Sequence, residues 1–335
     1  VTGNRIYNNA ASSATNTSTT YGIGILADPP ASDPIVVSNN AVYNFRGGTM
    51  YGIYVSTATN VLIYHNTVDF SLPTGSSNTN YGIYLTGTNT GTVVKNNNVS
   101  ITDGTTGTTY GFYYNTAASI TDAQKNNFYV NSSTAATQYY GYYAAAYPTQ
   151  AAFQAAHPTR EVGSPAEDPW YLDPLNGDFT PLAINLGTGE DLSLAVPVDI
   201  NGFSRPSQPT IGAFENTIQK ASNDLGVTHL VNPTEVCGGL YDIEVNVRNF
   251  GKNIVTSAEV HWSVNDVLQT PLTILNMSLD TFGAANPFDT VVTLGSYNFT
   301  SQPLTFKIWT SQPNNQPDTA NLNDTLTIIL HPALS

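Results

Sequence analysis

The chain has 335 residues, of which 40% are hydrophobic and only 10% are charged, and its net charge at pH 7 is −14. This acidic balance argues against binding to nucleic acid, which requires clustered Lys and Arg, and against binding to anionic membrane surfaces. No apolar run approaches the roughly 18 residues that a membrane-spanning helix requires. Frequent Asn, Thr, Ser, Gly and Tyr favour β-structure with polar turns over helices.

Two short sequence markers recur about every 30 residues in the first part of the chain. A Tyr-Gly pair followed by an apolar or aromatic residue begins at Tyr21, Tyr51, Tyr81, Tyr110 and Tyr140. An Asn two residues before an apolar one recurs with the same mean period, at Asn4, Asn40, Asn66, Asn97 and Asn126. Two phased markers in five copies predict a solenoid.

The residues between these markers indicate which kind of solenoid to expect. The apolar runs are short, β-branched or aromatic, and separated by polar turns, which predicts strands. A period near 30 residues fits one coil of a parallel β-helix, so we predict about five coils over residues 1–147. Alternate strand residues face the same side. Tyr51, Ile53 and Val55 should therefore face the core and stack on their counterparts one coil later.

The same alternation places two sets of polar side chains. Asn40, Asn66, Asn97 and Asn126 should lie at turns, where stacked amides can hydrogen-bond from coil to coil. Tyr54 should face outward, as should its counterparts Tyr84, Tyr113 and Tyr143. Such a row of tyrosines could bind sugar rings or a protein partner. Alternatively, a loop covers the row, or the rings stack only for stability.

The phrases "YGIY" and "NNAV/HNTV/NNNV" resemble the right-handed parallel β-helix repeat family over about residues 1–147. That family includes polysaccharide lyases, hydrolases, phage tailspikes and adhesins. The resemblance therefore implies the fold and not one function.

Residues 148–219 are predicted to cap the last coil, because an open solenoid end exposes core and strand edges. Residues 148–158 should form a short helix that Pro158 ends. The later phrases "DINGFSR" and "IGAFE" resemble the C-terminal end of bacterial choice-of-anchor β-helix proteins. Asp199, Arg205 and Glu215 lie in them. We interpret these three as a structural ion-pair cluster, with catalytic acids and a substrate-binding arginine as the alternative.

Residues 222–331 alternate apolar and polar residues in about seven short runs, which predicts an immunoglobulin-like β-sandwich. One strand should face inward with Tyr241, Ile243, Val245 and Val247, and another with Val260, Trp262 and Val264. The phrases "VRNFGKNIVTSAEVHWSVND" and "PDTANLNDTLTI" resemble cell-adhesion-related bacterial domains of secreted Bacteroidota proteins. Such domains often belong to large cell-surface or type IX-secreted chains, so the resemblance implies an extracellular or cell-surface location.

The sequence shows no clear catalytic or metal-binding motif. No two acidic residues occupy the same repeat position in neighbouring coils, and the five His residues are scattered. We therefore predict no metal and no cofactor, although a calcium site made of loop carboxylates and carbonyls stays open.

These observations favour a non-catalytic extracellular or cell-surface scaffold or adhesin. Its expected partner is a polysaccharide or another surface protein, bound through the side of the β-helix. The chain begins inside a repeat, so we expect it to be part of a larger chain or assembly. The alternative is a polysaccharide-degrading enzyme of the β-helix class, either a lyase or a glycoside hydrolase.

Overall fold

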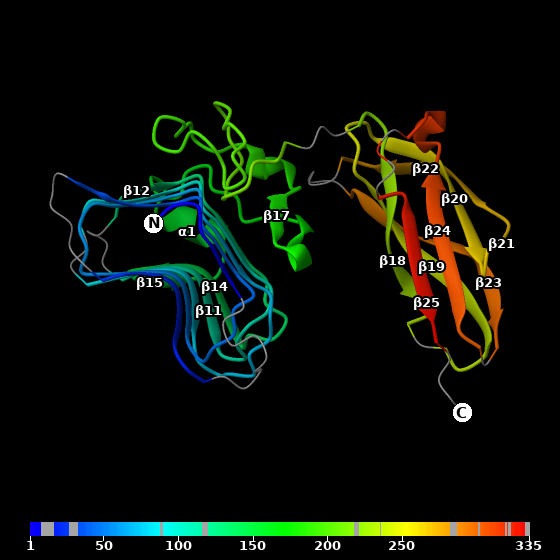
Figure 1. Cartoon of the computed structure of the whole chain (residues 1–335), viewed down its shortest axis with the longest axis horizontal. Helices are drawn as coiled ribbons and strands as arrows, with labels where there is room; N and C mark the ends of the chain where they lie inside the picture. The colour runs from blue at the N-terminus through cyan, green and yellow to red at the C-terminus, as the bar shows by residue number, and fades with distance from the viewer. Residues whose placement is uncertain are drawn as a thin grey trace. The chain divides into compact units, whose positions relative to one another are not determined.

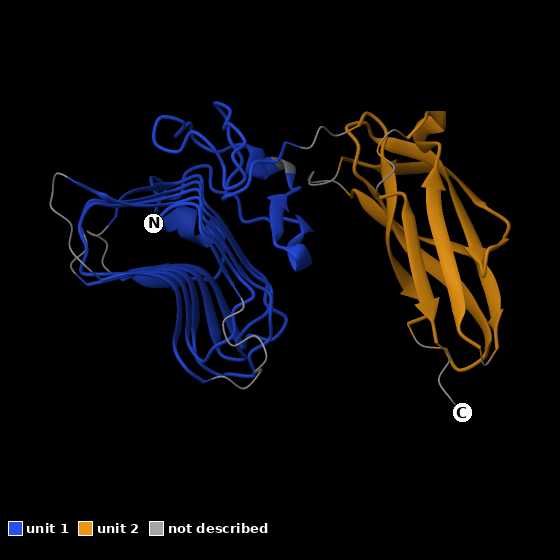
Figure 2. Ribbon diagram, viewed as in Figure 1, with its two compact units in different colours: residues 1–217 blue, residues 218–335 orange. Residues whose placement is uncertain are grey.

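The computed structural model describes residues 1–7, 17–26, 33–87, 90–115, 120–217, 221–234, 236–281, 287–300, 302–318, 320 and 323–331. The chain divides into two compact units, Val1–Thr217 and Ile218–Ser335 (Figure 2). Strands make up 49% of the chain and helices 5%, which confirms the predicted all-β class. Among the described residues, no helix is long and apolar enough to cross a membrane.

The first unit is a parallel β-solenoid in which three sheets follow the stack of coils (Figure 1). One sheet contains, in spatial order, β1 (Arg5–Tyr7), β4 (Ala41–Tyr43), β7 (Thr67–Phe70), β10 (Asn98–Ile101) and β13 (Asn127–Val130). The second contains β15 (Ala145–Tyr147), β14 (Thr137–Tyr143), β11 (Thr108–Tyr114), β8 (Asn80–Thr86), β5 (Met50–Ser56) and β2 (Thr20–Ile25). The third contains β12 (Ile120–Gln124), β9 (Thr92–Lys95), β6 (Val61–Tyr64) and β3 (Ile35–Ser38).

The register of the second sheet confirms that residues one repeat apart lie over one another. Ile23 pairs with Ile53, Ile53 with Ile83, and Ile83 with Phe112. All four side chains are buried in one hydrophobic core that runs through the coils. The repeat therefore places apolar residues at the same position in successive coils, where their burial stabilises the stack.

Tyr51 does not face the core, contrary to the prediction. The register between β5 and β8 is the same on both sides of Gly52, because Tyr51 pairs with Tyr81 and Ile53 with Ile83. A Cβ on Gly52 would lie 2.5 Å from both the Gly82 carbonyl oxygen and the Val68 Cγ1, so this residue also faces inward. Two consecutive inward residues bend the strand and reverse the alternation, which places Tyr51 on the outer surface.

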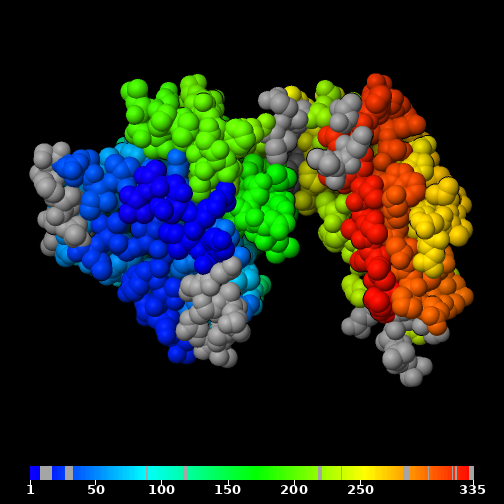
Figure 3. Space-filling view, viewed as in Figure 1, coloured from blue at the N-terminus to red at the C-terminus, as the bar shows by residue number. Residues whose placement is uncertain are grey.

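We call residues 148–217 the cap, and the space-filling view shows this green segment against the blue coils (Figure 3). Contrary to the prediction, only its first part closes the last coil, where Val162 pairs with Gln124. The rest lies along the side of the coils, because Glu167 contacts Asn127 in the last coil and Gly177 contacts Arg5 in the first. Helix α1 (Gln150–Ala156) begins after Thr149, whose hydroxyl accepts a 3.2 Å hydrogen bond from the Ala152 amide. Its Phe153 is buried against the Phe112 and Tyr140 rings. The remaining cap elements are β16 (Tyr171–Asp173), β17 (Asp178–Pro181) and the 3-10 turns Pro174–Asn176 and Ile184–Gly187.

The second unit is a β-sandwich of antiparallel strands. One sheet contains β18 (Leu225–Asn232), β19 (Gly239–Asn249) and β23 (Asp289–Phe299). The other contains β21 (Val267–Leu268), β20 (Val255–Val264), β24 (Leu304–Ser311) and β25 (Thr325–Leu330), and β22 (Leu272–Leu279) also pairs with β20. The 3-10 turn Pro313–Asn315 follows β24. Of the seven residues predicted to face inward, Tyr241 is half-buried and packs against the core. The other six are buried in it: Ile243, Val245, Val247, Val260, Trp262 and Val264.

Candidate functional site

Nine tyrosines form two columns on the outer surface of the sheet that contains β5, and we call them the tyrosine face. The first column contains Tyr21, Tyr51, Tyr81, Tyr110 and Tyr139, and the second contains Tyr54, Tyr84, Tyr113 and Tyr142. Neighbouring ring centroids are 5.0–5.6 Å apart in the first column and 4.2–5.5 Å apart in the second. The rings within each column are nearly parallel, so each column is a continuous stack.

The bend at the inward-facing glycine brings the two columns into contact. Tyr51 and Tyr54 meet edge to face, with centroids 5.0 Å apart and planes at 70°. Tyr110 and Tyr113 do the same at 5.1 Å and 89°. This arrangement places the positive edge of one ring against the negative face of another, which stabilises aromatic pairs. The tyrosine face is therefore internally packed and rigid.

The packing also favours the neutral form of some of the phenol groups. Burial, and then the neighbouring tyrosines, raise the pKa of Tyr113 to about 12. The same causes raise the pKa of Tyr51. Because the flat faces of the rings contact one another along each column, the surface presents ring edges and hydroxyls to a ligand. A sugar ring cannot lie flat on an interior member of either column.

The fourth member of the predicted tyrosine row is Tyr142 and not Tyr143. Tyr113 pairs with Tyr142, whereas Tyr143 pairs with the inward-facing Tyr114 and its ring lies 4.8 Å from the His157 ring. In the last coil Tyr140 occupies the position of the earlier glycines and faces inward. Each earlier glycine lies against the backbone of the next coil, and Tyr140 has no further coil above it to meet. The Tyr-Gly marker is therefore one residue out of register there.

The predicted turn asparagines form a continuous ladder of buried amides. The Nδ2 atoms of Asn40, Asn66 and Asn97 donate to the Oδ1 atom of the next asparagine at 2.9, 2.9 and 3.0 Å. Each Oδ1 atom also accepts a backbone amide of the preceding coil, at 2.9–3.1 Å. The structure thus brings Asn40, Asn66, Asn97 and Asn126 together in one column of hydrogen bonds.

Sequence reasoning missed the end of this ladder. Glu161, a fully buried cap residue with a backbone φ of 50°, accepts a 2.9 Å hydrogen bond from Asn126 Nδ2 at its Oε2 atom. The Ser164 hydroxyl donates to the same oxygen at 2.7 Å and accepts from the Asn126 backbone amide at 2.9 Å. Glu161 belongs to no repeat, so no periodic signal identifies it.

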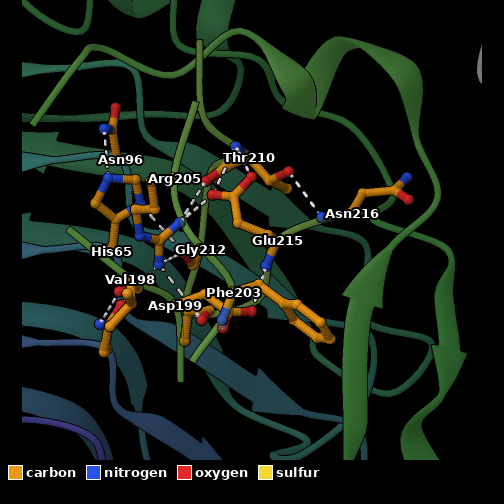
Figure 4. Close-up of polar contacts among 12 residues, drawn as sticks. His65, Asn96, Val198, Asp199, Phe203, Arg205, Thr210, Gly212, Glu215 and Asn216 are labelled. Atoms are coloured by element: carbon orange, nitrogen blue, oxygen red, sulfur yellow. Dashed lines mark hydrogen bonds and ion pairs between the residues drawn. The ribbon is translucent and has the colours of Figure 1, made fainter. Parts of the chain in front are cut away.

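Asp199, Arg205 and Glu215 meet under the cap in one buried network (Figure 4). Arg205 forms an ion pair with Glu215, and its Nη2 atom donates to Asn39 Oδ1 at 2.7 Å. Asp199 accepts the backbone amides of Glu215, Asn201 and Phe203 at 2.8–2.9 Å. The carboxylates and the Nη atoms of Arg205 are paired within the fold, which is the arrangement expected of a structural cluster, although the buried Arg205 Nε has no partner among the described residues.

His65 joins the same region from the side of the coils (Figure 4). Its Nδ1 atom lies 3.2 Å from the Gly212 carbonyl oxygen, and its Nε2 atom lies 2.9 Å from Asn96 Nδ2. Since Asn96 Nδ2 can only donate, we assign Nε2 as the acceptor and Nδ1 as the donor. Burial lowers the pKa of His65 well below its ordinary value, so the ring stays neutral. The site therefore holds coil and cap together.

The structure brings Lys95, Asp122 and Glu190 together on the third sheet, a group that the sequence did not reveal because Glu190 lies in the cap. Lys95 Nζ lies 2.7 Å from Asp122 Oδ2 and 2.8 Å from Glu190 Oε1. Burial lowers the pKa of Lys95, but the two carboxylates outweigh it and the pKa is raised. A lysine that holds its proton this firmly is a poor general base.

Three aspartates lie close together in the sandwich. Carboxylate oxygens of Asp224, Asp318 and Asp324 lie within 4.8 Å of one another. Burial and then the charges of Asp318 and Asp224 raise the pKa of Asp324 to about 7. Carboxylate oxygens are the ligands that hard cations such as Ca²⁺ prefer. These three residues could hold a metal ion.

Comparison with known proteins places the chain in no family. No family model matches it, and no curated protein matches it. One similar solved structure is the CARDB domain of the PF1109 protein from Pyrococcus furiosus in complex with di-metal ions, with a TM-score of 0.27 and 20% identity over 35% of this chain and 95% of that one. Another is a domain of a cell surface protein from Methanosarcina acetivorans, with a TM-score of 0.28 and 20% identity over 34% of this chain and 94% of that one.

Proposed function

We propose that this protein is a non-catalytic extracellular or cell-surface scaffold whose tyrosine face binds an extended polysaccharide. The observation that carries the proposal is the double column of stacked tyrosines on an outer surface of the solenoid. Tyrosine combines a large apolar body with a hydroxyl, and it is enriched where proteins bind partners. The resemblance of the second unit to adhesion-related domains supports the extracellular location, and a type IX secretion route has only this support.

The periodicity of the face favours a polymer over a small ligand. The same pair of ring edges and hydroxyls recurs in each coil at the strand spacing, so a repeating chain meets the same contacts several times. Several weak contacts along one rigid surface give useful affinity, because the second and later contacts form intramolecularly. A surface protein that presents repeated side chains is the alternative partner, and it would leave polysaccharides unbound.

Binding is tested on a glycan array and on insoluble polysaccharides, with variants that remove hydroxyls but keep the ring stacks. The combined substitutions Tyr51→Phe, Tyr54→Phe, Tyr81→Phe and Tyr84→Phe should abolish binding without loss of fold. Tyr7→Phe is the matched control, because Tyr7 is 51% exposed but stacks on Tyr43 in another sheet. Binding that the four-fold variant retains would overturn the proposal.

A polysaccharide-degrading enzyme is the second candidate, and one observation favours it. Lys95, Asp122 and Glu190 combine two acids and a base in one place, as such an enzyme requires. The raised pKa of Lys95 and the ion pairs argue for a structural role. A reducing-sugar assay on the polysaccharides that bind decides between the two, since the scaffold releases no sugar ends.

We also propose that the carboxylates of Asp224, Asp318 and Asp324 bind calcium. The close approach of three oxygen ligands supports this, and Asn323 Nδ2 donates to Asp224 Oδ1 at 2.9 Å and helps to orient it. A cation would relieve the mutual repulsion that raises the pKa of Asp324. Such a site would stabilise the sandwich and would take no part in catalysis.

A further inference from the structure

β13 is the last strand of its sheet, and one of its edges faces a cavity. In a parallel ladder, the N–H and C=O groups of one residue point to the same neighbour, and those of the next residue point the other way. The Asn127 amide donates to the Asn97 carbonyl at 2.7 Å, and the Asn131 amide donates to the Ile101 carbonyl at 2.9 Å. The main-chain groups of Phe128 and Val130 therefore point away from β10.

The other two sheets of the solenoid are covered at this end. β15 pairs antiparallel with β14. Val162 acts as the next rung of the third sheet, where it accepts a 3.2 Å hydrogen bond from the Lys125 amide. Within the residues that the structure describes, no such rung lies on β13, and neither the Phe128 nor the Val130 amide has a hydrogen-bond partner.

A cavity of about 430 Å³ occupies the position that the next rung would fill. Phe128, Val130 and Asn131 form one wall, and Thr149, Gln150 and Ala151 line it from the cap. This volume lies in the range of ordinary ligand sites. Tyr140 also lines the cavity, and its buried hydroxyl has no hydrogen-bond partner among the described residues.

We propose that this cavity binds one extended polypeptide segment of a partner protein, which adds to β13 as a further strand. Strand addition satisfies alternating N–H and C=O groups along a free edge, and no other common ligand matches that pattern. The segment would continue, at the same spacing, the ladder that already joins β7, β10 and β13. The site is independent of the tyrosine face, because it uses the end of the stack and not its side.

Hydrogen exchange of the full 335-residue chain tests the free edge directly. We expect the Phe128 and Val130 amides to exchange rapidly, whereas the Tyr129 amide, which points to β10, is protected. Slow exchange of all three amides without any ligand would show that the edge is already satisfied and would overturn the proposal.

The partner class is tested by selecting random peptides that bind the immobilised chain and then measuring their affinity for two variants. Val130→Pro removes an edge N–H that no ladder bond uses, and proline is tolerated at such edges. Ala151→Trp fills the cavity. Val130→Pro should weaken binding by about tenfold, the effect of one or two lost hydrogen bonds. Ala151→Trp should weaken it by at least as much, because the added ring excludes the peptide from the cavity. Ala155→Trp is the matched control, because Ala155 is an exposed alanine of α1 that does not line the cavity.

Further outcomes separate the possible occupants. N-methylation of alternate amides of a selected peptide should weaken binding, and the Phe128 and Val130 amides should become protected in the complex. Self-association of the chain that Val130→Pro abolishes would identify a second copy as the source of the strand. The proposal is overturned if no peptide is recovered, or if the recovered peptides bind both variants as well as the unaltered chain.

Discussion

Asn126 Nδ2 donates a 2.9 Å hydrogen bond to the Oε2 atom of Glu161, so the amide ladder of the coils ends on a carboxylate of the cap. The two residues are separated by 35 positions, and both are fully buried. Each asparagine of the ladder donates from its Nδ2 atom to the Oδ1 atom of the next asparagine. Asn126 is the last of them, so its Nδ2 atom requires an acceptor that lies outside the ladder. The Oε2 atom of Glu161 meets this requirement, because it accepts from both Asn126 and Ser164.

The contribution of Glu161 to the stability of the first unit should fall as the pH rises toward neutrality. Burial raises the pKa of Glu161 from 4.5 to about 7, although hydrogen bonds from Asn126, Ser164 and Tyr114 oppose the shift. The folded chain therefore binds this proton more tightly than the unfolded chain. The contribution is complete below about pH 4.5 and is lost by about pH 7, with a loss of about 3 kcal/mol at most.

Glu161→Gln should remove this pH dependence, because the amide is neutral throughout. Chemical denaturation of both proteins between pH 5 and pH 8 measures the effect, and the variant should gain relative stability at the higher pH. Glu244→Gln in the sandwich is the control, since Glu244 is only half-buried. An unchanged slope in Glu161→Gln would show that another group causes the dependence.

Interior rungs of the ladder should matter far more than its first member. Asn97→Ala removes the donor to Asn126 Oδ1 and to the Ile63 carbonyl, and it leaves Asn66 Nδ2 without this acceptor. Each buried polar group left unsatisfied costs about 1–3 kcal/mol, so we expect a loss of at least about 3 kcal/mol in the free energy of unfolding. Asn4→Ala, at the exposed start of the ladder, should cost less than about 1 kcal/mol in the same assay.

The bend that forms the tyrosine face should depend on glycine. In Gly52→Ala the new Cβ would lie 2.5 Å from the Gly82 carbonyl oxygen and the Val68 Cγ1, so the coils must separate, at a cost of about 1–3 kcal/mol. Gly24→Ala should be nearly neutral, because a Cβ there meets nothing within 4 Å. Thermal unfolding of the two variants provides the comparison, and equal melting temperatures would contradict the role given to Gly52.

How far the sequence predicts the structure depends on whether a residue belongs to the repeat. Ile53 and Ile83 could be paired from the sequence, because a fixed period of buried side chains allows one register. Tyr51 could not be oriented, since the bend at Gly52 reverses the alternation and simple patterning contains no sign of it. Tyr143 was misassigned because the Tyr-Gly letters shift by one residue in the last coil, where no further coil requires the glycine.

Whether a candidate site could be predicted also depends on whether its residues belong to the repeat. The tyrosine column that contains Tyr54 and the amide ladder follow from the period, apart from that one-residue shift, whereas the column that contains Tyr51 was predicted to face the core. Glu161 and Glu190 lie in the cap, whose path over the coils no periodic signal describes, so their contacts with Asn126 and Lys95 required coordinates. The cavity beside β13 likewise depends on the path of the cap, which leaves one edge of that strand uncovered.

The acidic group of the sandwich should respond to calcium. Millimolar Ca²⁺ should raise the melting temperature of the second unit, because a ligand that binds only the folded state stabilises it. EDTA should reverse the shift, and Mg²⁺, which demands smaller octahedral sites, should produce less of it.

Asp324→Asn removes one charge of the group formed with Asp224 and Asp318, so it should abolish the Ca²⁺ response. Without metal, the same variant should be more stable than the unaltered chain, because the repulsion among the carboxylates falls. Asp266→Asn, in the exposed β20–β21 turn, is the matched control and should leave the response intact. A Ca²⁺ shift of equal size in Asp324→Asn would place the cation elsewhere.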